Sequence, residues 1–126
     1  MKISKLFALI FLVIAAAQFF SGCKQDPVIP DTPLAKFKDD IQAIIIGNCT
    51  ASGCHGGVEP KSSPLLTYDD VLKNGDIKAK DANGSKLYIL LKDLGEDRMP
   101  KKPNAPLSDE QIELVYLWIM QGAKNN

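Results

Sequence analysis

The sequence predicts an all-α protein. Apolar residues recur at steps of three and four near both ends of the main part of the chain, the spacing of one face of a helix. Each of these segments follows a residue type that caps helices and ends at a glycine. No segment shows a convincing alternation of apolar and polar residues, and there is no internal repeat. We therefore expect a helix at each end, with short helices and long loops between them.

The N-terminus has the pattern of an export signal. Lys2 and Lys5 form a short basic region, and Leu6 to Ala17 is a run of twelve apolar residues. As a helix this run would span about 18 Å, which is short of the roughly 30 Å hydrocarbon core of a membrane. Ser21-Gly22-Cys23 resembles a bacterial lipobox. We therefore expect residues 1–22 to be a lipoprotein signal peptide, although an ordinary cleaved signal followed by an incidental cysteine is the alternative.

Lipidation of Cys23 would leave the protein exported and lipid-anchored to a bacterial membrane, on the periplasmic side or at the cell surface. Residues 24–33 carry three prolines and no apolar periodicity, so 23–33 is expected to be a flexible tether and 34–126 a single domain. Without the two lysines of the signal, 13 basic residues remain against 15 acidic ones, a net charge of about −2. Because nucleic-acid binding needs a basic excess, no nucleic-acid partner is expected.

The first helix is expected to begin with Thr32 as N-cap and Pro33 in the first helical position. Gly47-Asn48 is expected to end it, which would lead the chain directly into a cluster of cysteines and a histidine. Its apolar face consists of Leu34, Phe37, Ile41 and Ile44 or Ile45.

Two short helices are expected in the middle of the chain. Thr67 with Asp70 three residues later predicts a capping box, and Gly75 predicts the end of that helix. Ser85 is expected to cap a second helix that contains Leu87, Tyr88, Leu90 and Leu91. The polar segment 95–106 carries three prolines and is expected to be a loop.

The last helix has the clearest signals. Ser108 and Gln111 predict a second capping box, and Gly122 predicts the stop. Ile112, Val115 and Ile119 follow at helical spacing, with Leu114 and Trp118 beside them. Trp118 is expected to be a core residue, with a place at the edge of a cofactor as the alternative.

The stretch NCTASGCHGG, residues 48–57, holds Cys49, Cys54 and His55, the only histidine of the sequence. Three interpretations are open. A Cys49–Cys54 disulfide suits an exported protein but leaves His55 without a role. Zinc needs about four ligands, so a carboxylate or water would have to complete the set. The third is covalent haem attachment, whose usual signature is Cys-x-x-Cys-His.

The haem interpretation requires the spacer between the cysteines to leave the helix. Positions five apart lie about 140° around a helix axis, so Cys49 and Cys54 would not share a face of a regular helix. Ser52-Gly53 is pliable enough for a bulge. Haem iron commonly takes a second axial ligand, and the methionines after the signal are Met99 and Met120. Met99 precedes a proline, which favours an extended backbone, although a gap-filling or exposed loop residue is the alternative.

These motifs together resemble a small class I cytochrome c domain of the single-haem bacterial lipoprotein type, over roughly residues 34–124. The order is helix, CxxxxCHGG, capped short helix, SKLYxLL, RMP, LSDEQI and WIxxGA. The resemblance implies packed N- and C-terminal helices around one covalent haem c. It implies thioether bonds from Cys49 and Cys54, with His55 and Met99 as the axial iron ligands. The widened spacer is a departure from the usual attachment motif.

Three charged residues near Met99 have two interpretations each. Arg98 is expected either to pair with a haem propionate or to be a solvated loop charge. Lys101 and Lys102 would either dock an acidic redox partner or form a solvated face, and we favour the solvated face.

The sequence thus predicts an electron carrier rather than an enzyme: a membrane-tethered protein with one haem c, His/Met ligation and unknown redox partner proteins. It could act as a subunit of a larger oxidoreductase complex. The alternative is a haem-free exported lipoprotein in which a Cys49–Cys54 disulfide stabilises a structural or binding module. A haem enzyme such as a peroxidase ranks lower, because it would need an open iron position and distal acid–base groups.

Overall fold

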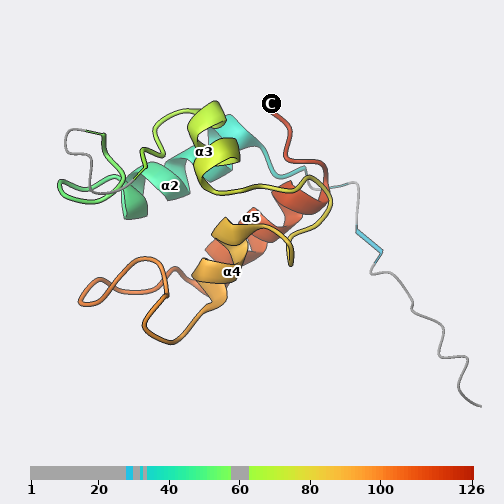
Figure 1. The fold of residues 1–126 in the computed structure, drawn as a ribbon. Coiled ribbons are helices and arrows are strands. Elements are labelled where there is room, and N and C mark those ends of the chain that lie inside the picture. Colours follow the sequence, from blue (N-terminus) through green and yellow to red (C-terminus); the bar gives the residue numbers. More distant parts are fainter. Residues whose placement is uncertain (1–27, 30–31, 33, 58–62) are drawn as a thin grey trace, which may run out of the picture.

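A computed structural model describes residues 28–29, 32, 34–57 and 63–126. This part of the chain contains helices and no strand, so the all-α prediction is confirmed for it. None of its helices has the length and apolar character needed to cross a membrane. The signal segment, Cys23 and most of the tether lie outside the described residues. The elements are the π-helical turn η2 (Phe37–Ile41) and the helices α2 (Gln42–Cys49), α3 (Tyr68–Asn74), α4 (Lys86–Lys92) and α5 (Asp109–Met120) (Figure 1).

The two ends of the domain are held together by hydrogen bonds. Helix α5 packs against both η2 and α4. The Asn126 side chain accepts the Phe37 N–H at 3.0 Å, and its main-chain oxygen accepts the Lys38 N–H at 3.0 Å. The Gln121 side chain accepts the Ala35 N–H at 3.0 Å. The segment that enters the first helix is therefore held by the segment that leaves the last one.

An aromatic cluster fills the junction between η2, α3 and α5. The rings of Phe37 and Tyr68 meet edge to face with centroids 5.0 Å apart, and Trp118 lies 5.6 Å from Phe37. Trp118 is 1% exposed, and its indole N–H donates to the Lys124 carbonyl at 2.9 Å. The Tyr68 hydroxyl donates to the Ala123 carbonyl at 2.7 Å. Trp118 is thus a core residue, as expected.

The predicted start of the first helix is wrong. The helical turn begins at Phe37, and Lys36 before it is extended (φ −102°, ψ 136°), so Thr32 is not the N-cap. Leu34 is 51% exposed rather than part of the buried face. The physical reason is that the main chain before Phe37 bonds to the C-terminal segment instead of continuing a helix. Pro33 lies outside the described residues.

The predicted end of this helix is also too early. Gly47 and Asn48 lie within α2, which continues to Cys49. The Asn48 side chain donates to the Ile44 carbonyl at 2.8 Å, which is compatible with a helical backbone. The Thr50 hydroxyl donates to the Ile46 carbonyl at 2.8 Å and satisfies an acceptor of the last turn. Cys49 is therefore the last residue of the helix.

Both predicted capping boxes are confirmed. The Thr67 hydroxyl accepts the Asp70 N–H at 3.1 Å, and the Asp70 carboxylate accepts the Thr67 N–H at 3.0 Å. Ser108 and Gln111 make the same reciprocal pair at the start of α5. Gly75 is the C-cap of α3, as predicted.

The end of α5 follows the Schellman pattern. The Gly122 N–H donates to the Ile119 carbonyl at 3.0 Å, and the Ala123 N–H donates to the Trp118 carbonyl at 2.8 Å. Gly122 has a φ of +103°, which requires the freedom of a glycine. The predicted stop is confirmed.

Ser85 occupies the predicted N-cap position of α4, but its side chain bonds elsewhere. The hydroxyl is fully buried; it accepts the Lys78 N–H at 2.8 Å and donates to the Asp81 carbonyl at 2.8 Å. Ser85 thus orders the loop before α4, which carries one wall of the site described next.

Candidate cofactor-binding site

A cavity of about 640 Å³ lies between the end of α2, helix α4 and the loop before α5. It falls within the roughly 300–1,000 Å³ typical of small-molecule and cofactor pockets. Its lining includes Cys49, Cys54, His55 and Met99. The structure thus brings the four residues predicted to hold a cofactor to one cavity, although Met99 is 44 positions from His55 in the sequence.

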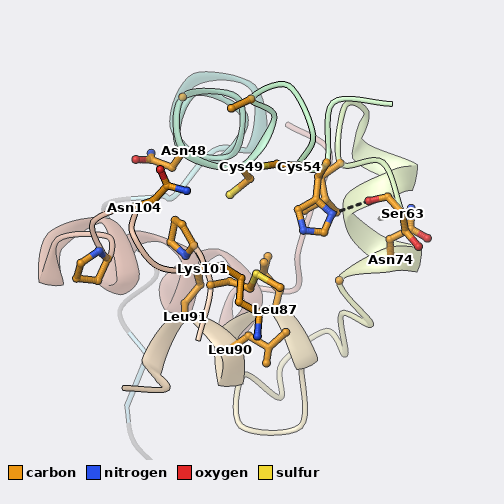
Figure 2. A pocket seen from close by; sticks show the side chains of 18 of the residues that line it. Asn48, Cys49, Cys54, Ser63, Asn74, Leu87, Leu90, Leu91, Lys101 and Asn104 are labelled. Carbon is orange, nitrogen blue, oxygen red and sulfur yellow. Dashed lines mark hydrogen bonds between the residues drawn. The ribbon is translucent and has the colours of Figure 1, made fainter. Parts of the chain in front are cut away.

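The wall opposite the cysteines is apolar. Figure 2 shows Cys49 and Cys54 on one side, with Leu87, Leu90 and Leu91 of α4 across the cavity. These leucines were expected in a helix but were not identified as site residues. Their spacing of three and four positions was the available signal, since it places them on one helix face. Besides His55, the polar side chains of the lining are Asn48, Ser63, Asn74, Lys86, Lys101 and Asn104.

The spacer between the cysteines leaves the helix, as the haem interpretation requires. After Cys49 the chain turns, and the Cys54 N–H donates to the Ala51 carbonyl at 2.9 Å. The His55 N–H then reaches back to the Cys49 carbonyl at 3.0 Å. Gly53 has a φ of +78°, a conformation that glycine adopts at little cost. The turn therefore returns Cys54 and His55 to the end of α2.

Gly56, the first glycine after the histidine, is required by close packing. A Cβ atom at this position would collide with the main-chain oxygen of Thr50. A main-chain obstacle cannot rotate away as a side chain can. Only glycine therefore lets the chain leave His55 along this path.

His55 is held by a main-chain acceptor. Its Nδ1 lies 2.7 Å from the Ser63 carbonyl oxygen, which can only accept a hydrogen bond, so Nδ1 carries the proton. In the neutral ring, Nε2 then has its lone pair available for a metal. The Leu65 N–H also donates to the His55 carbonyl at 3.0 Å, so the segment around Ser63 is fixed beside His55. Sequence reasoning missed Ser63, because a main-chain acceptor leaves no signal in the residue type.

Cys49 is a buried, free thiol. Burial and, to a smaller extent, the neighbouring Cys54 raise the pKa of this thiol to about 11. The Cys49 thiol is therefore protonated at neutral pH and is a weak nucleophile on its own.

Met99 is tied to helix α4. Its N–H donates to the Leu90 carbonyl at 2.9 Å, and its half-buried side chain lines the cavity. Met120 is half-buried on α5, packs against the hydrophobic core and is not part of the lining. Of the two methionines, the loop residue is the one at the site.

Arg98 is buried, so its interpretation as a solvated loop charge is wrong. It is 9% exposed, and its Nη2 donates to the Asn104 carbonyl at 2.6 Å. Lys101 and Lys102 are exposed; Lys101 lies 3.6 Å from the Asp97 carboxylate, and Lys102 lies 3.9 Å from that of Glu96. The two lysines thus belong to an exposed set of mixed charges.

Within the described ranges, no three His, Cys, Asp or Glu side chains form a group that could hold a metal ion. A scan of known protein families, a search of characterised proteins and a search of solved structures found no match to this chain.

Proposed function

We propose that this protein is an electron carrier of cytochrome c type, with one haem attached to Cys49 and Cys54 and bound axially by His55 and Met99. One observation carries the proposal: these four side chains line a single cavity of about 640 Å³. The finer fold assignment, a cytochrome c-like domain, is part of the same proposal.

The chemistry of the lining fits this group. Two thiols lie next to an imidazole whose Nε2 is available, and a thioether lies on the loop beside α4. Haem iron binds both imidazole and thioether ligands. The leucines of α4 supply an apolar wall for the macrocycle.

Attachment needs no oxidant and no leaving group. Each thiol adds across a vinyl double bond: the sulfur bonds to one carbon, and the thiol hydrogen goes to the other. Because the Cys49 thiol has a raised pKa, we expect its reaction to depend on maturation machinery rather than to be spontaneous.

When bound, the haem supplies a one-electron Fe(III)/Fe(II) couple, and a Met/His ligand pair raises its reduction potential. The protein contributes ligation, orientation through the Ser63 carbonyl and exclusion of water by the leucine wall. The donor and acceptor are redox partner proteins, and a lipid on Cys23 would hold the carrier at a membrane.

The test is a spectrum of the full-length protein, expressed with a cytochrome c maturation system and extracted in detergent. We expect a reducible c-type α-band, a pyridine haemochrome and an intact mass that includes one haem. Absence of the band, with an intact mass two hydrogens lower and no haem, would contradict the proposal. That outcome would favour the haem-free lipoprotein with a Cys49–Cys54 disulfide.

A further inference from the structure

Arg98 is a buried cation without an anionic partner among the described residues. It is the only arginine of the sequence and is 9% exposed. Its Nη2 donates to the Asn104 carbonyl, while its Nε is buried and has no hydrogen-bond partner in the described part of the chain. A guanidinium stays charged in proteins, and burying it unpaired costs several kcal/mol.

The acidic residues of the same loop do not neutralise Arg98. The side chains of Glu96 and Asp97 are 94% and 86% exposed, and both pair with lysines of the loop. The single neutral acceptor of the guanidinium, the Asn104 carbonyl, leaves its charge uncompensated. A carboxylate suits a guanidinium, since two N–H donors of the guanidinium match the two carboxylate oxygens.

Arg98 is not part of the cavity lining itself, but it adjoins two residues that are. Met99, the next residue, lines the cavity, and so does Asn104, whose carbonyl Arg98 binds. The guanidinium is thus hydrogen-bonded to a residue of the cavity lining. A ligand that fills the cavity and carries carboxylates could supply the missing anion.

We propose that Arg98 binds a carboxylate of the haem, so that ligand binding compensates a charge the protein has buried. This inference rests on the proposed function. It assigns to the loop 98–104 a second contact with the ligand besides Met99, and that contact is electrostatic rather than coordinative.

The test uses the full-length, haem-loaded protein with two isotope labels. ¹⁵N-arginine labels one guanidinium, that of Arg98, because the sequence holds no other arginine. 5-Aminolevulinate with ¹³C at its carboxyl carbon labels the haem carboxylates. In the reduced, low-spin state we expect strong dipolar dephasing between the guanidinium nitrogens and a haem carboxylate carbon in solid-state NMR. No dephasing in protein that carries covalent haem would overturn the inference.

A second measurement uses matched variants. Arg98→Gln removes the buried charge, whereas Lys102→Gln removes an exposed charge from the same loop. A positive charge near the iron favours Fe(II), so we expect a lower reduction potential in Arg98→Gln and little change in Lys102→Gln. Equal potentials in wild type and both variants would overturn the inference.

The outcomes separate the two proposals. If the wild-type protein carries no haem, the proposed function fails and the inference fails with it. If covalent haem is present but the two labels are not in contact, only the inference fails. Should Arg98→Gln not mature, the labelled wild-type protein still gives the decision.

Discussion

One hydrogen bond decides which ring nitrogen of His55 is available to a metal. The Ser63 carbonyl accepts from Nδ1 at 2.7 Å, which fixes the tautomer and leaves the Nε2 lone pair free for the proposed iron. Because this acceptor belongs to the main chain, substitution of the Ser63 side chain should leave the ligand in place. The orientation of the His55 ring therefore depends on the position of the main chain at residue 63 and not on the residue type there.

The methionines provide a direct test of the axial ligand. Met99→Leu keeps the volume of the side chain but removes the sulfur, so we expect a lower reduction potential and rapid carbon monoxide binding by the ferrous protein. Met120→Leu, on α5 and away from the cavity, should change neither property and should cost less than about 1.5 kcal/mol of stability. The two variants are compared by redox titration and stopped-flow absorption. The same response in both would contradict ligation by Met99.

The Cys49 thiol makes the stability of the haem-free chain depend on pH. Its pKa rises from 9.0 to about 11 on folding, so between these values the folded state binds more protons than the unfolded state. The stabilising contribution is complete below pH 9 and is lost as the pH rises through about 11. We expect the free energy of unfolding of the reduced, haem-free chain to fall more steeply over this interval than that of Cys49→Ala.

Denaturant titrations at several pH values measure this difference. The haem-loaded protein is the control, because a thioether sulfur carries no proton and the extra slope should be absent. A wild-type slope equal to that of Cys49→Ala would show that the thiol is not buried in the folded haem-free chain.

At the scale of elements, the sequence predicted the helix ends whose partners are local. Thr67 pairs with Asp70 and Ser108 with Gln111, each three residues away, and both capping boxes form as expected. The start of the first helix was wrong because its partner Gln121 lies 86 residues from Ala35. A contact at that separation leaves no pattern in a local stretch of sequence.

For the candidate site as well, local features could be predicted from the sequence, whereas features that depend on long-range packing could not. The turn between Cys49 and His55 followed from residue types, because a five-residue step cannot place both cysteines on one helix face. The leucine wall of α4 and the burial of Arg98 did not follow, because they depend on how α4 and the loop after it pack. The candidate residues themselves could be identified from the sequence, but their surroundings could be described only from the fold.

The turn after α2 can be tested by substitution of Gly56. Gly56→Ala places a Cβ against the Thr50 carbonyl, so the turn must shift, at a cost of more than about 1 kcal/mol. We expect less covalent haem per chain and a lower midpoint in thermal unfolding. Ser52→Ala, an exposed change in the same turn, should stay within about 0.5 kcal/mol of wild type. Normal haem content and stability in Gly56→Ala would show that the turn adopts another path.

At the scale of the whole molecule, the aromatic cluster and the candidate site are separate parts of the fold. The aromatic cluster of Phe37, Tyr68 and Trp118 joins η2, α3 and α5, and none of the three lines the cavity. The wider hydrophobic core does reach the site, because four of its residues also line the cavity: Cys49, Leu65, Leu87 and Leu91. The core therefore supports the site through the end of α2 and through α4, and changes in the aromatic cluster should alter stability without altering the cavity lining.

Trp118→Phe tests that separation. The substitution removes the indole N–H that donates to the Lys124 carbonyl and leaves a void in the cluster, so we expect a loss of about 1–3 kcal/mol in the free energy of unfolding. Glu113→Ala, an exposed change on the same helix, should lie within about 0.5 kcal/mol of wild type. The α-band and the reduction potential should be unchanged in both, because neither residue lines the cavity. A shifted potential in Trp118→Phe would instead place the indole against the haem, and the aromatic cluster and the site would then have to be treated as one unit.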